Sequence, residues 1–117
     1  MADTKFKILE NNSMDTVVRQ KIENDVKNNK VMLYMKGTPD QPQCGFSARA
    51  VDILRQYDVP FHSFNIFEDE AIRQGIKEYA YWPTIPQLYV NGEFIGGCDI
   101  MTEMHENGEL GKILGWK

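Results

Sequence analysis

The residue best placed to do chemistry is Cys44, which follows the polar, proline-containing stretch 36–43. An apolar run precedes this stretch, and a helical pattern of hydrophobic residues begins just after the cysteine. A cysteine between a buried strand and a helix lies where unpaired backbone N–H groups and the helix dipole stabilise negative charge. This position favours the thiolate, which is the nucleophilic and metal-binding form of cysteine. Lys36 adds positive charge nearby, whereas Gly45 and the polar loop argue against the alternative of a buried, inert cysteine.

The segment around Cys44 also resembles a known family. Lys-Gly-Thr-Pro at 36–39 and Cys-Gly-Phe-Ser at 44–47 are similar to the active-site segment of the monothiol, CGFS-type glutaredoxins. Ser47 stands where the Cys-x-x-Cys redox motif has its second cysteine. The long loop before Cys44 is also typical of the monothiol class. With two later segments in the same order, the resemblance covers residues 14–114 and implies a thioredoxin-like fold of the glutaredoxin type.

The resemblance implies a binding site for glutathione, a tripeptide that carries carboxylates at both ends, an ammonium group and a thiol. Lys36 and Arg73 would bind the glycyl carboxylate, and the backbone of Ile85 would pair with the cysteinyl peptide. The N–H of Cys98 and the carboxylate of Asp99 would hold the γ-glutamyl end. Local sequence leaves other interpretations open, because Arg73 alone reads as a solvated helix residue and Asp99 as an ordinary helix cap.

Pro86 and Cys98 have alternative interpretations of their own. In the resembling family, the proline of Thr-Ile-Pro, here Pro86, has a cis peptide bond and faces the active cysteine. Local sequence alone favours an ordinary turn proline. Cys98 either resolves a disulfide formed with Cys44 or is a small packed residue at the start of a helix, and we favour packing.

Cys44 itself has two chemical interpretations. As an oxidoreductase, its thiolate would attack the sulfur of a glutathionylated protein and pass the glutathione to a second glutathione, an exchange that needs a single cysteine. As a metal ligand, it would supply one of the four thiolates that a [2Fe–2S] cluster requires. The family implies a homodimer in which Cys44 of each chain and two glutathiones bind the cluster, with partners such as BolA-like proteins and iron–sulfur apo-proteins. We expect cluster transfer in iron–sulfur assembly and iron homeostasis to be the main role, with weak oxidoreductase activity.

Other function classes fit the residues less well. Cys44 to Arg49 is one residue shorter than the Cys-x₅-Arg phosphate loop of tyrosine phosphatases. The histidines His62 and His105 carry no protease motif, and zinc sites need more cysteine and histidine at short spacing. A net charge of −4 without a basic cluster argues against nucleic acid. No apolar run approaches the roughly 20 residues of a membrane span.

The elements that position these residues follow from hydrophobic periodicity and turn signals. An apolar strand, a helix after Cys44 and a second strand form a parallel crossover unit, and Asn91-Gly92 predicts a hairpin. The element order predicts an α/β protein with a four-stranded mixed sheet flanked by helices. The predicted strands are 31–35, 61–67, 87–90 and 93–95. The predicted helices run from Ser13 to 28–29, from Cys44 to about 57, from 68–70 to beyond 79, from Cys98 to near 108 and from about 110 to 114.

Residues 13–117 are predicted to be one glutaredoxin-type domain, preceded by a flexible tail at 1–12. The N-terminus lacks a secretory apolar region, and its acidic residues make it a poor organellar transit peptide. Two widely spaced cysteines do not indicate a disulfide scaffold, so we expect a reducing, cytoplasmic location.

Phe46 and Ile100 are expected on the inner faces of their helices.

Overall fold

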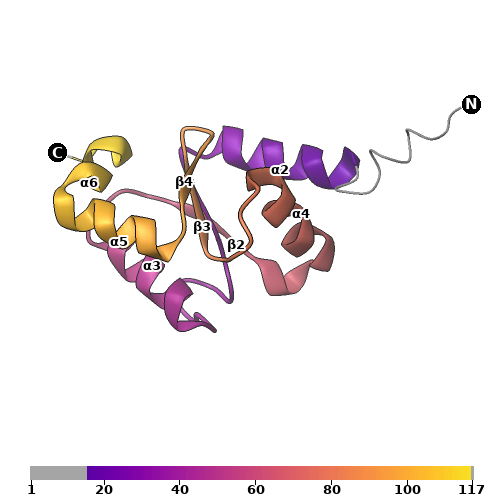
Figure 1. Ribbon diagram of the computed structural model, residues 1–117, viewed down its shortest axis with the longest axis horizontal. Coiled ribbons are helices and arrows are strands. Elements are labelled where there is room, and N and C mark those ends of the chain that lie inside the picture. Colours follow the sequence, from indigo (N-terminus) through magenta and orange to yellow (C-terminus); the bar gives the residue numbers. More distant parts are fainter. Residues whose placement is uncertain (1–15, 117) are drawn as a thin grey trace, which may run out of the picture.

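The computed structural model describes residues 16–116, in which helices and strands alternate around one sheet (Figure 1). The predicted helix start at Ser13 and the predicted tail at 1–12 lie outside this range. Within it, no helix combines the length and the apolar composition needed to cross a bilayer. In chain order the elements are α2 (Thr16–Asn28), β1 (Val31–Met35), α3 (Gly45–Arg55), β2 (His62–Asn65), the 3₁₀ helix η1 (Ile66–Glu68), α4 (Glu70–Ala80), β3 (Gln87–Val90), β4 (Glu93–Gly96), α5 (Cys98–Asn107) and α6 (Glu109–Leu114).

The sheet has four strands in the order β2-β1-β3-β4. β1 runs parallel to β2 and antiparallel to β3, and β3 and β4 form an antiparallel hairpin. The turn residues Asn91 and Gly92 have φ values of 54° and 83°, as a hairpin turn with two left-handed residues requires. The predicted four-stranded mixed sheet is therefore confirmed.

Helices cover both faces of the sheet, and β1 shows how the sequence divides between them. Side chains alternate along a strand, so Val31, Leu33 and Met35 pack with α3, α5 and α6. Met32 and Tyr34 pack with α2 and α4 on the opposite face. Figure 1 shows the two helical layers on either side of the strands. All five residues of β1 are buried, which explains its continuous apolar sequence.

Two predicted boundaries are wrong by about two residues. The second strand ends at Asn65 rather than at Phe67, because the Asn65 side chain accepts the N–H of Phe67 and turns the chain into η1. The helix after Cys44 ends at Arg55, before the predicted Tyr57. The predicted stop of α5 near Gly108 is confirmed, since that glycine adopts a left-handed φ of 86°.

Two residues expected in the interior are not there. Phe46 is 62% exposed, because the first turn of α3 borders the groove described below rather than the sheet. Ile100 is half-buried and lines the same groove, while its neighbour Met101 fills the core position.

Candidate functional site

Cys44 immediately precedes α3 and lies between β1 and that helix, as its position in the sequence predicts. Its thiol is half-exposed and forms no disulfide. The carbonyl oxygen of Cys44 accepts a hydrogen bond from the N–H of Ala48 at 2.9 Å, which begins the helical ladder. The first N–H groups of α3 have no helical acceptor of their own and remain available to the sulfur.

The surroundings of Cys44 stabilise its charged form. Partial burial alone would raise the pKa of the thiol, but this effect is outweighed. The backbone N–H groups of Ser47 and Phe46, the charge of Lys36 and the Ser47 hydroxyl together lower the pKa below its ordinary value. The site therefore holds an accessible cysteine whose surroundings favour the thiolate, the form suited to nucleophilic attack or to metal binding.

Ser47 is fully buried and serves the site structurally. Its Oγ accepts the backbone N–H of Lys36 at 3.0 Å, so it joins the end of β1 to the first turn of α3. A hydroxyl at this position cannot form a disulfide with Cys44. The site is consequently monothiol at the position where a dithiol motif would hold its second sulfur.

The loop between β1 and Cys44 is held by contacts at several points. Thr38 and Gln41 exchange backbone hydrogen bonds of 3.2 and 3.0 Å, and Gln43 N–H donates to the Lys36 carbonyl oxygen at 2.9 Å. Gly37 has a φ of +90°, and a Cβ on it would lie 2.5 Å from the Gln41 carbonyl oxygen. Only glycine fits there, and the fixed loop delivers Cys44 to the start of α3.

A groove of about 420 Å³ lies beside the thiol, and Lys36 and Phe46 belong both to the surroundings of Cys44 and to the groove. It contains all five residues that the resemblance assigned to glutathione: Lys36, Arg73, Ile85, Cys98 and Asp99. Its full lining is Lys36, Phe46, Arg73, Lys77, Trp82, Pro83, Thr84, Ile85, Pro86, Gly97, Cys98, Asp99 and Ile100. The structure thus brings together residues from the ends of β1 and α4, the loop before β3 and the start of α5, although their binding roles stay a prediction.

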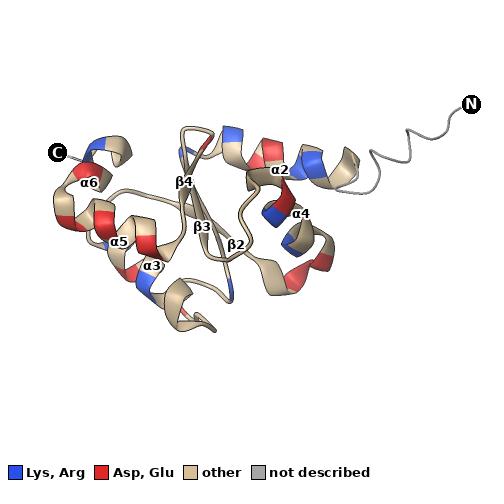
Figure 2. Ribbon diagram, viewed as in Figure 1, with Lys and Arg blue, Asp and Glu red and all other residues tan. Residues whose placement is uncertain are grey.

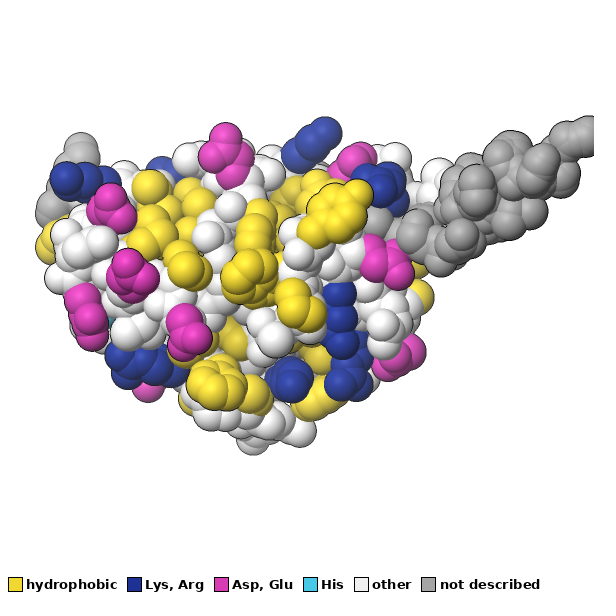
Figure 3. All heavy atoms as spheres, in the orientation of Figure 1, with side chains coloured by type: hydrophobic (Ala, Val, Ile, Leu, Met, Phe, Trp, Pro, Cys, Tyr) yellow, Lys and Arg dark blue, Asp and Glu magenta, His cyan; other side chains and the backbone are white. Residues whose placement is uncertain are grey.

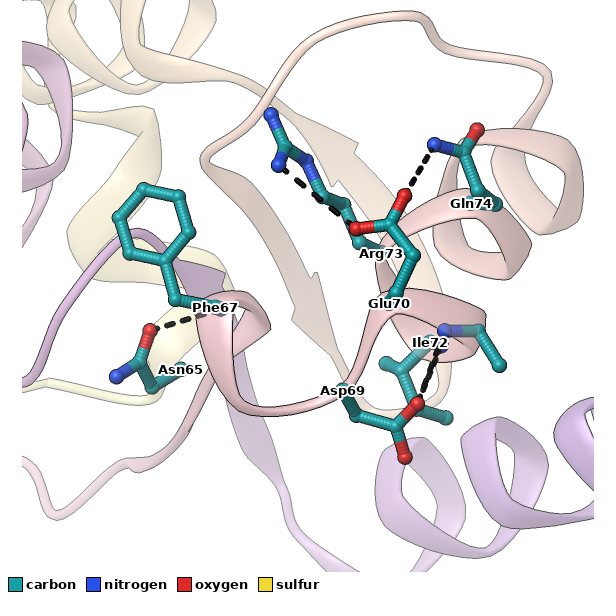
Figure 4. A network of polar contacts seen from close by, with 8 residues as sticks. Asn65, Phe67, Asp69, Glu70, Ile72, Arg73 and Gln74 are labelled. Carbon is teal, nitrogen blue, oxygen red and sulfur yellow. Dashed lines mark hydrogen bonds and ion pairs between the residues drawn. The ribbon is translucent and has the colours of Figure 1, made fainter.

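Charge is unevenly distributed along the groove. Lys36, Arg73 and Lys77 supply cations, and Asp99 is its acidic residue. Arg73 projects from α4 with its Nη1 atom 3.9 Å from Glu70 Oε1 (Figure 4). In the space-filling view, basic side chains lie at the lower right of a central apolar area and acidic ones along its left side, although both kinds also occur elsewhere on this face (Figure 3). The groove therefore suits an elongated ligand that carries negative charge at its cationic end.

The loop before β3 forms one wall of the groove. The Ile85–Pro86 peptide bond is cis, as the resemblance implied. Ile85 and Pro86 both line the groove, and Ile85 is 7% exposed. Gln87 anchors this loop, because its Nε2 donates to the carbonyl oxygens of Trp82 at 3.1 Å and Thr84 at 3.3 Å.

The start of α5 also borders the groove, and Gly97 permits a close approach of its backbone to the loop before β3. Gly97 precedes the helix, and a Cβ on it would lie 3.2 Å from the Pro86 carbonyl oxygen. Asp99 is exposed in the first turn and does not cap the helix, so the alternative interpretation of Asp99 as the N-cap is wrong. The first N–H groups of α5 and the Asp99 carboxylate therefore stand together beside the groove.

Cys98 differs from Cys44 in burial and in acidity. It is 8% exposed, and burial raises the pKa of its thiol even though Thr102 and Arg49 act in the opposite direction. A buried thiol with a raised pKa is a weaker nucleophile near neutral pH. These features agree with the packing interpretation, and in the structure Cys98 is a free cysteine.

Sequence reasoning missed part of the groove. Lys77 lies one helical turn after Arg73, and this i, i+4 spacing places both cations on one face of α4. Trp82 and Thr84 adjoin the Thr-Ile-Pro segment and line the groove with it. Helical spacing thus offered a signal for Lys77, whereas nothing local marked Phe46 as a groove residue.

The histidines lie away from this site. His62 is exposed on β2, and His105 on α5 contacts the hydroxyl of Tyr57; neither lines the groove. In residues 16–116, no three side chains of histidine, cysteine, aspartate or glutamate gather as a metal site would require.

These features define a class of protein. The chain has a mixed sheet between helical layers, a cysteine at the start of the helix after β1 and a cis-proline loop in the groove beside it. This combination is typical of the thioredoxin-like thiol proteins.

Comparison with known proteins narrows the class to a family. The glutaredoxin family model matches residues 31–95. A Synechocystis protein described as a monothiol glutaredoxin is 54% identical over 101 residues, which cover 86% of this chain and 94% of that protein. The mitochondrial monothiol glutaredoxin-S15 of Arabidopsis thaliana is 56% identical over 89 residues, 76% of this chain but only 53% of its own length. The solution structure of reduced poplar apo GrxS14 matches with a TM-score of 0.75 and 51% identity, covering 84% of this chain and 90% of that one. The chain belongs to the glutaredoxin family, and specifically to its monothiol members.

Proposed function

We propose that this protein binds glutathione in the groove beside Cys44 and, as a homodimer, carries and transfers a glutathione-ligated [2Fe–2S] cluster. The observation that carries the proposal is the accessible Cys44 thiolate next to a groove with cations at one end and a helix N-terminus with Asp99 at the other. Cluster delivery to apo-proteins, alone or with a BolA-like partner, is the role we assign to it.

The groove matches the charge pattern of glutathione. Lys36 and Arg73 would bind the glycyl carboxylate, while the first N–H groups of α5 would bind the γ-glutamyl carboxylate. The Asp99 carboxylate would then pair with the ammonium group. A buckwheat glutaredoxin, 24% identical and of the same fold, has been solved as a glutathione complex. For this chain, the support is its own groove and the side chains that line it.

The count of thiolates supports a shared cluster. A [2Fe–2S] cluster held by thiolates alone needs four of them. Cys98 is buried, so each chain presents Cys44 as its accessible cysteine in the described residues. Two chains and two glutathione thiols complete the set. In this arrangement Cys44 binds iron directly, and the residues of the groove hold the glutathione that supplies the neighbouring ligand.

Anaerobic reconstitution with iron, sulfide and glutathione tests the proposal. The protein is expected to become a coloured dimer, as followed by visible absorbance and gel filtration, and to lose colour and dissociate when glutathione is removed. Cys44→Ser is expected to stay colourless. Cys98→Ser is the matched control, because it also removes one sulfur but leaves the accessible thiolate intact, and it is expected to form the coloured dimer.

A second function is favoured by the lowered pKa of Cys44. The Cys44 thiolate would attack the glutathione sulfur of a mixed disulfide, forming a Cys44–glutathione disulfide and releasing the protein thiolate. A glutathione thiolate would then attack this disulfide, regenerate Cys44 and leave as oxidised glutathione. A colourless monomer that efficiently reduces a glutathionylated substrate would make this activity, rather than cluster carriage, the main function.

A further inference from the structure

Asn65 lies outside the groove, yet its side chain joins two segments that lead to it. The N–H of Gly37 donates to Asn65 Oδ1 at 2.9 Å, and the N–H of Phe67 donates to the same oxygen at 3.0 Å. Asn65 ends β2, where it pairs with Met35 of β1, so the sheet fixes its backbone. Figure 4 shows its oxygen directed at the N–H of Phe67. One oxygen atom anchored in the sheet therefore holds both the segment after β1 and the turn η1.

The first of these segments carries Lys36. The Lys36 N–H donates to Ser47 Oγ at 3.0 Å, and its carbonyl oxygen accepts from Gln43 at 2.9 Å. The bond from Gly37 to Asn65 adds a third constraint, on the residue directly after Lys36. These bonds fix the backbone on both sides of the Lys36 Cα atom, and the bond to Asn65 is the one that ties it to the end of β2.

The second segment orients Arg73. The centroid of the Phe67 ring lies 5.7 Å from Arg73 Cζ, within the range of a cation–π contact. Arg73 Nε is buried and has no hydrogen-bond partner among residues 16–116, and within that range the Phe67 ring and Glu70 are the contacts that direct the guanidinium (Figure 4). Phe67 is 48% exposed and does not line the groove, and the contact with Arg73 gives this exposed ring a role.

The geometry points to Asn65 as a positioning residue that sets the spacing between the Lys36 ammonium and the Arg73 guanidinium, and thereby the selectivity of the groove for a ligand carboxylate. The inference rests on the proposed function, because it assigns the glycyl carboxylate of glutathione to this pair of cations. Neither Asn65 nor Phe67 lines the groove, so both act through the two cations. They act by holding the cations in place before the ligand arrives, which lowers the entropic cost of binding.

The test compares the binding of glutathione with that of glutathione whose glycyl carboxylate is amidated, both measured by calorimetry. The native protein is expected to prefer the free acid by about tenfold, because charge-assisted hydrogen bonds are lost with the amide. In Asn65→Ala this preference is expected to fall at least about threefold, since the mutation acts on the cations rather than on the rest of the groove. A general loosening of the fold would weaken both ligands and leave their ratio unchanged.

Asn107→Ala is the matched control. Asn107 Oδ1 accepts the N–H of Glu109 at 2.9 Å, the same local bond that Asn65 makes to Phe67, but it does so between α5 and α6 and away from the groove. This variant is expected to keep the native ratio. Amide hydrogen exchange, measured without ligand, is expected to quicken at both Gly37 and Phe67 in Asn65→Ala and at neither in the control.

Phe67→Leu tests the same inference on a half-exposed position, so it remains informative if Asn65→Ala does not fold. Loss of the aromatic face beneath Arg73 is expected to lower the acid-to-amide ratio. A native ratio in folded Asn65→Ala, or in Phe67→Leu, overturns the assignment. Failure of the native protein to bind glutathione would remove the proposed function and the carboxylate assignment with it, an outcome distinct from binding without selectivity.

Discussion

The lowered pKa of Cys44 results from the position of its thiol in the fold. Its position between strand and helix was sufficient to predict a stabilised thiolate, and the structure adds the contributions of Ser47, Phe46 and Lys36. The burial of Cys98 agrees with the packing interpretation that we favoured, although both cysteines stand next to a glycine at the start of a helix. Burial depends on long-range packing, and the sequence around each cysteine does not encode it.

Lys36→Ala is expected to raise the pKa of Cys44 and to slow its alkylation at neutral pH. Removing the ammonium charge leaves the backbone N–H groups as the main stabilising influence. The pH profile of iodoacetamide alkylation measures the change, with Lys112→Ala on α6 as the control for lost charge. Weaker glutathione binding and weaker cluster retention are expected in Lys36→Ala as well. An unchanged alkylation profile together with native glutathione affinity and cluster retention in Lys36→Ala would show that Lys36 only terminates its strand.

The lowered pKa also links Cys44 to stability. The folded pKa lies below the unfolded value, so the stabilisation is fully present above the unfolded pKa, near the ordinary thiol value of 9.0. It is lost as the pH falls through the folded pKa, because both states are then protonated. The difference in free energy of unfolding between the native protein and Cys44→Ser, from urea titrations, should therefore shrink as the pH is lowered. A difference that grows on acidification would contradict the direction of the shift.

At the scale of elements, the strands and the hairpin followed from the sequence, and the errors lie where side chains redirect the backbone. The pattern 87–95 with Asn91-Gly92 predicted the hairpin correctly. The end of β2 was missed because Asn65 caps η1, a bond whose effect depends on a side-chain orientation. Phe46 was assigned to the interior because helical spacing cannot distinguish a core from a ligand groove.

Ser47→Ala is expected to destabilise the protein by about 1–2 kcal/mol, because it removes the buried hydroxyl that accepts the Lys36 N–H at the junction of β1 and α3. Thr38→Ala is the matched control, since its hydroxyl accepts the N–H of Gln41 at 3.1 Å in an exposed loop. Urea denaturation compares the two. Equal losses in both variants would show that the Ser47 bond is no more important than a surface one.

Gly96→Ala is expected to destabilise the hairpin-to-α5 connection by roughly 2 kcal/mol or more. Gly96 has a φ of +154°, and an added Cβ would lie 2.6 Å from the Ile100 Cβ. Gly45→Ala provides the contrast, because nothing lies within 4 Å of its added Cβ, and it should be neutral or slightly stabilising in the first turn of α3. Thermal unfolding of the two variants measures the difference, and a stable Gly96→Ala protein would refute the steric argument.

Across the whole molecule, local charge matters more than the net charge of −4. Acidic residues predominate on α5, whereas α2, α4 and α6 carry both acidic and basic residues (Figure 2). Within the groove, however, the cations Lys36, Arg73 and Lys77 outnumber the acidic Asp99. A protein that is acidic overall therefore presents a cationic end to an anionic ligand.

Lys77→Gln and Lys112→Gln change the net charge equally, but only Lys77 lines the groove. Lys77→Gln is expected to weaken glutathione binding by roughly two- to fivefold and to reduce its salt dependence, because a screened cation–carboxylate attraction is lost. Lys112→Gln is expected to bind as the native protein does. Calorimetric titrations at low and high salt give the comparison. Equal weakening in both variants would mean that net charge, rather than groove charge, governs binding.

The composition of the reconstituted complex tests the central claim most directly. Native mass spectrometry under anaerobic conditions counts chains, iron, sulfide and glutathione in one measurement. Because each chain offers one accessible thiolate, we expect a complex of two chains, two glutathiones and one [2Fe–2S] unit. A cluster bound without glutathione, or held by a single chain, would contradict this account.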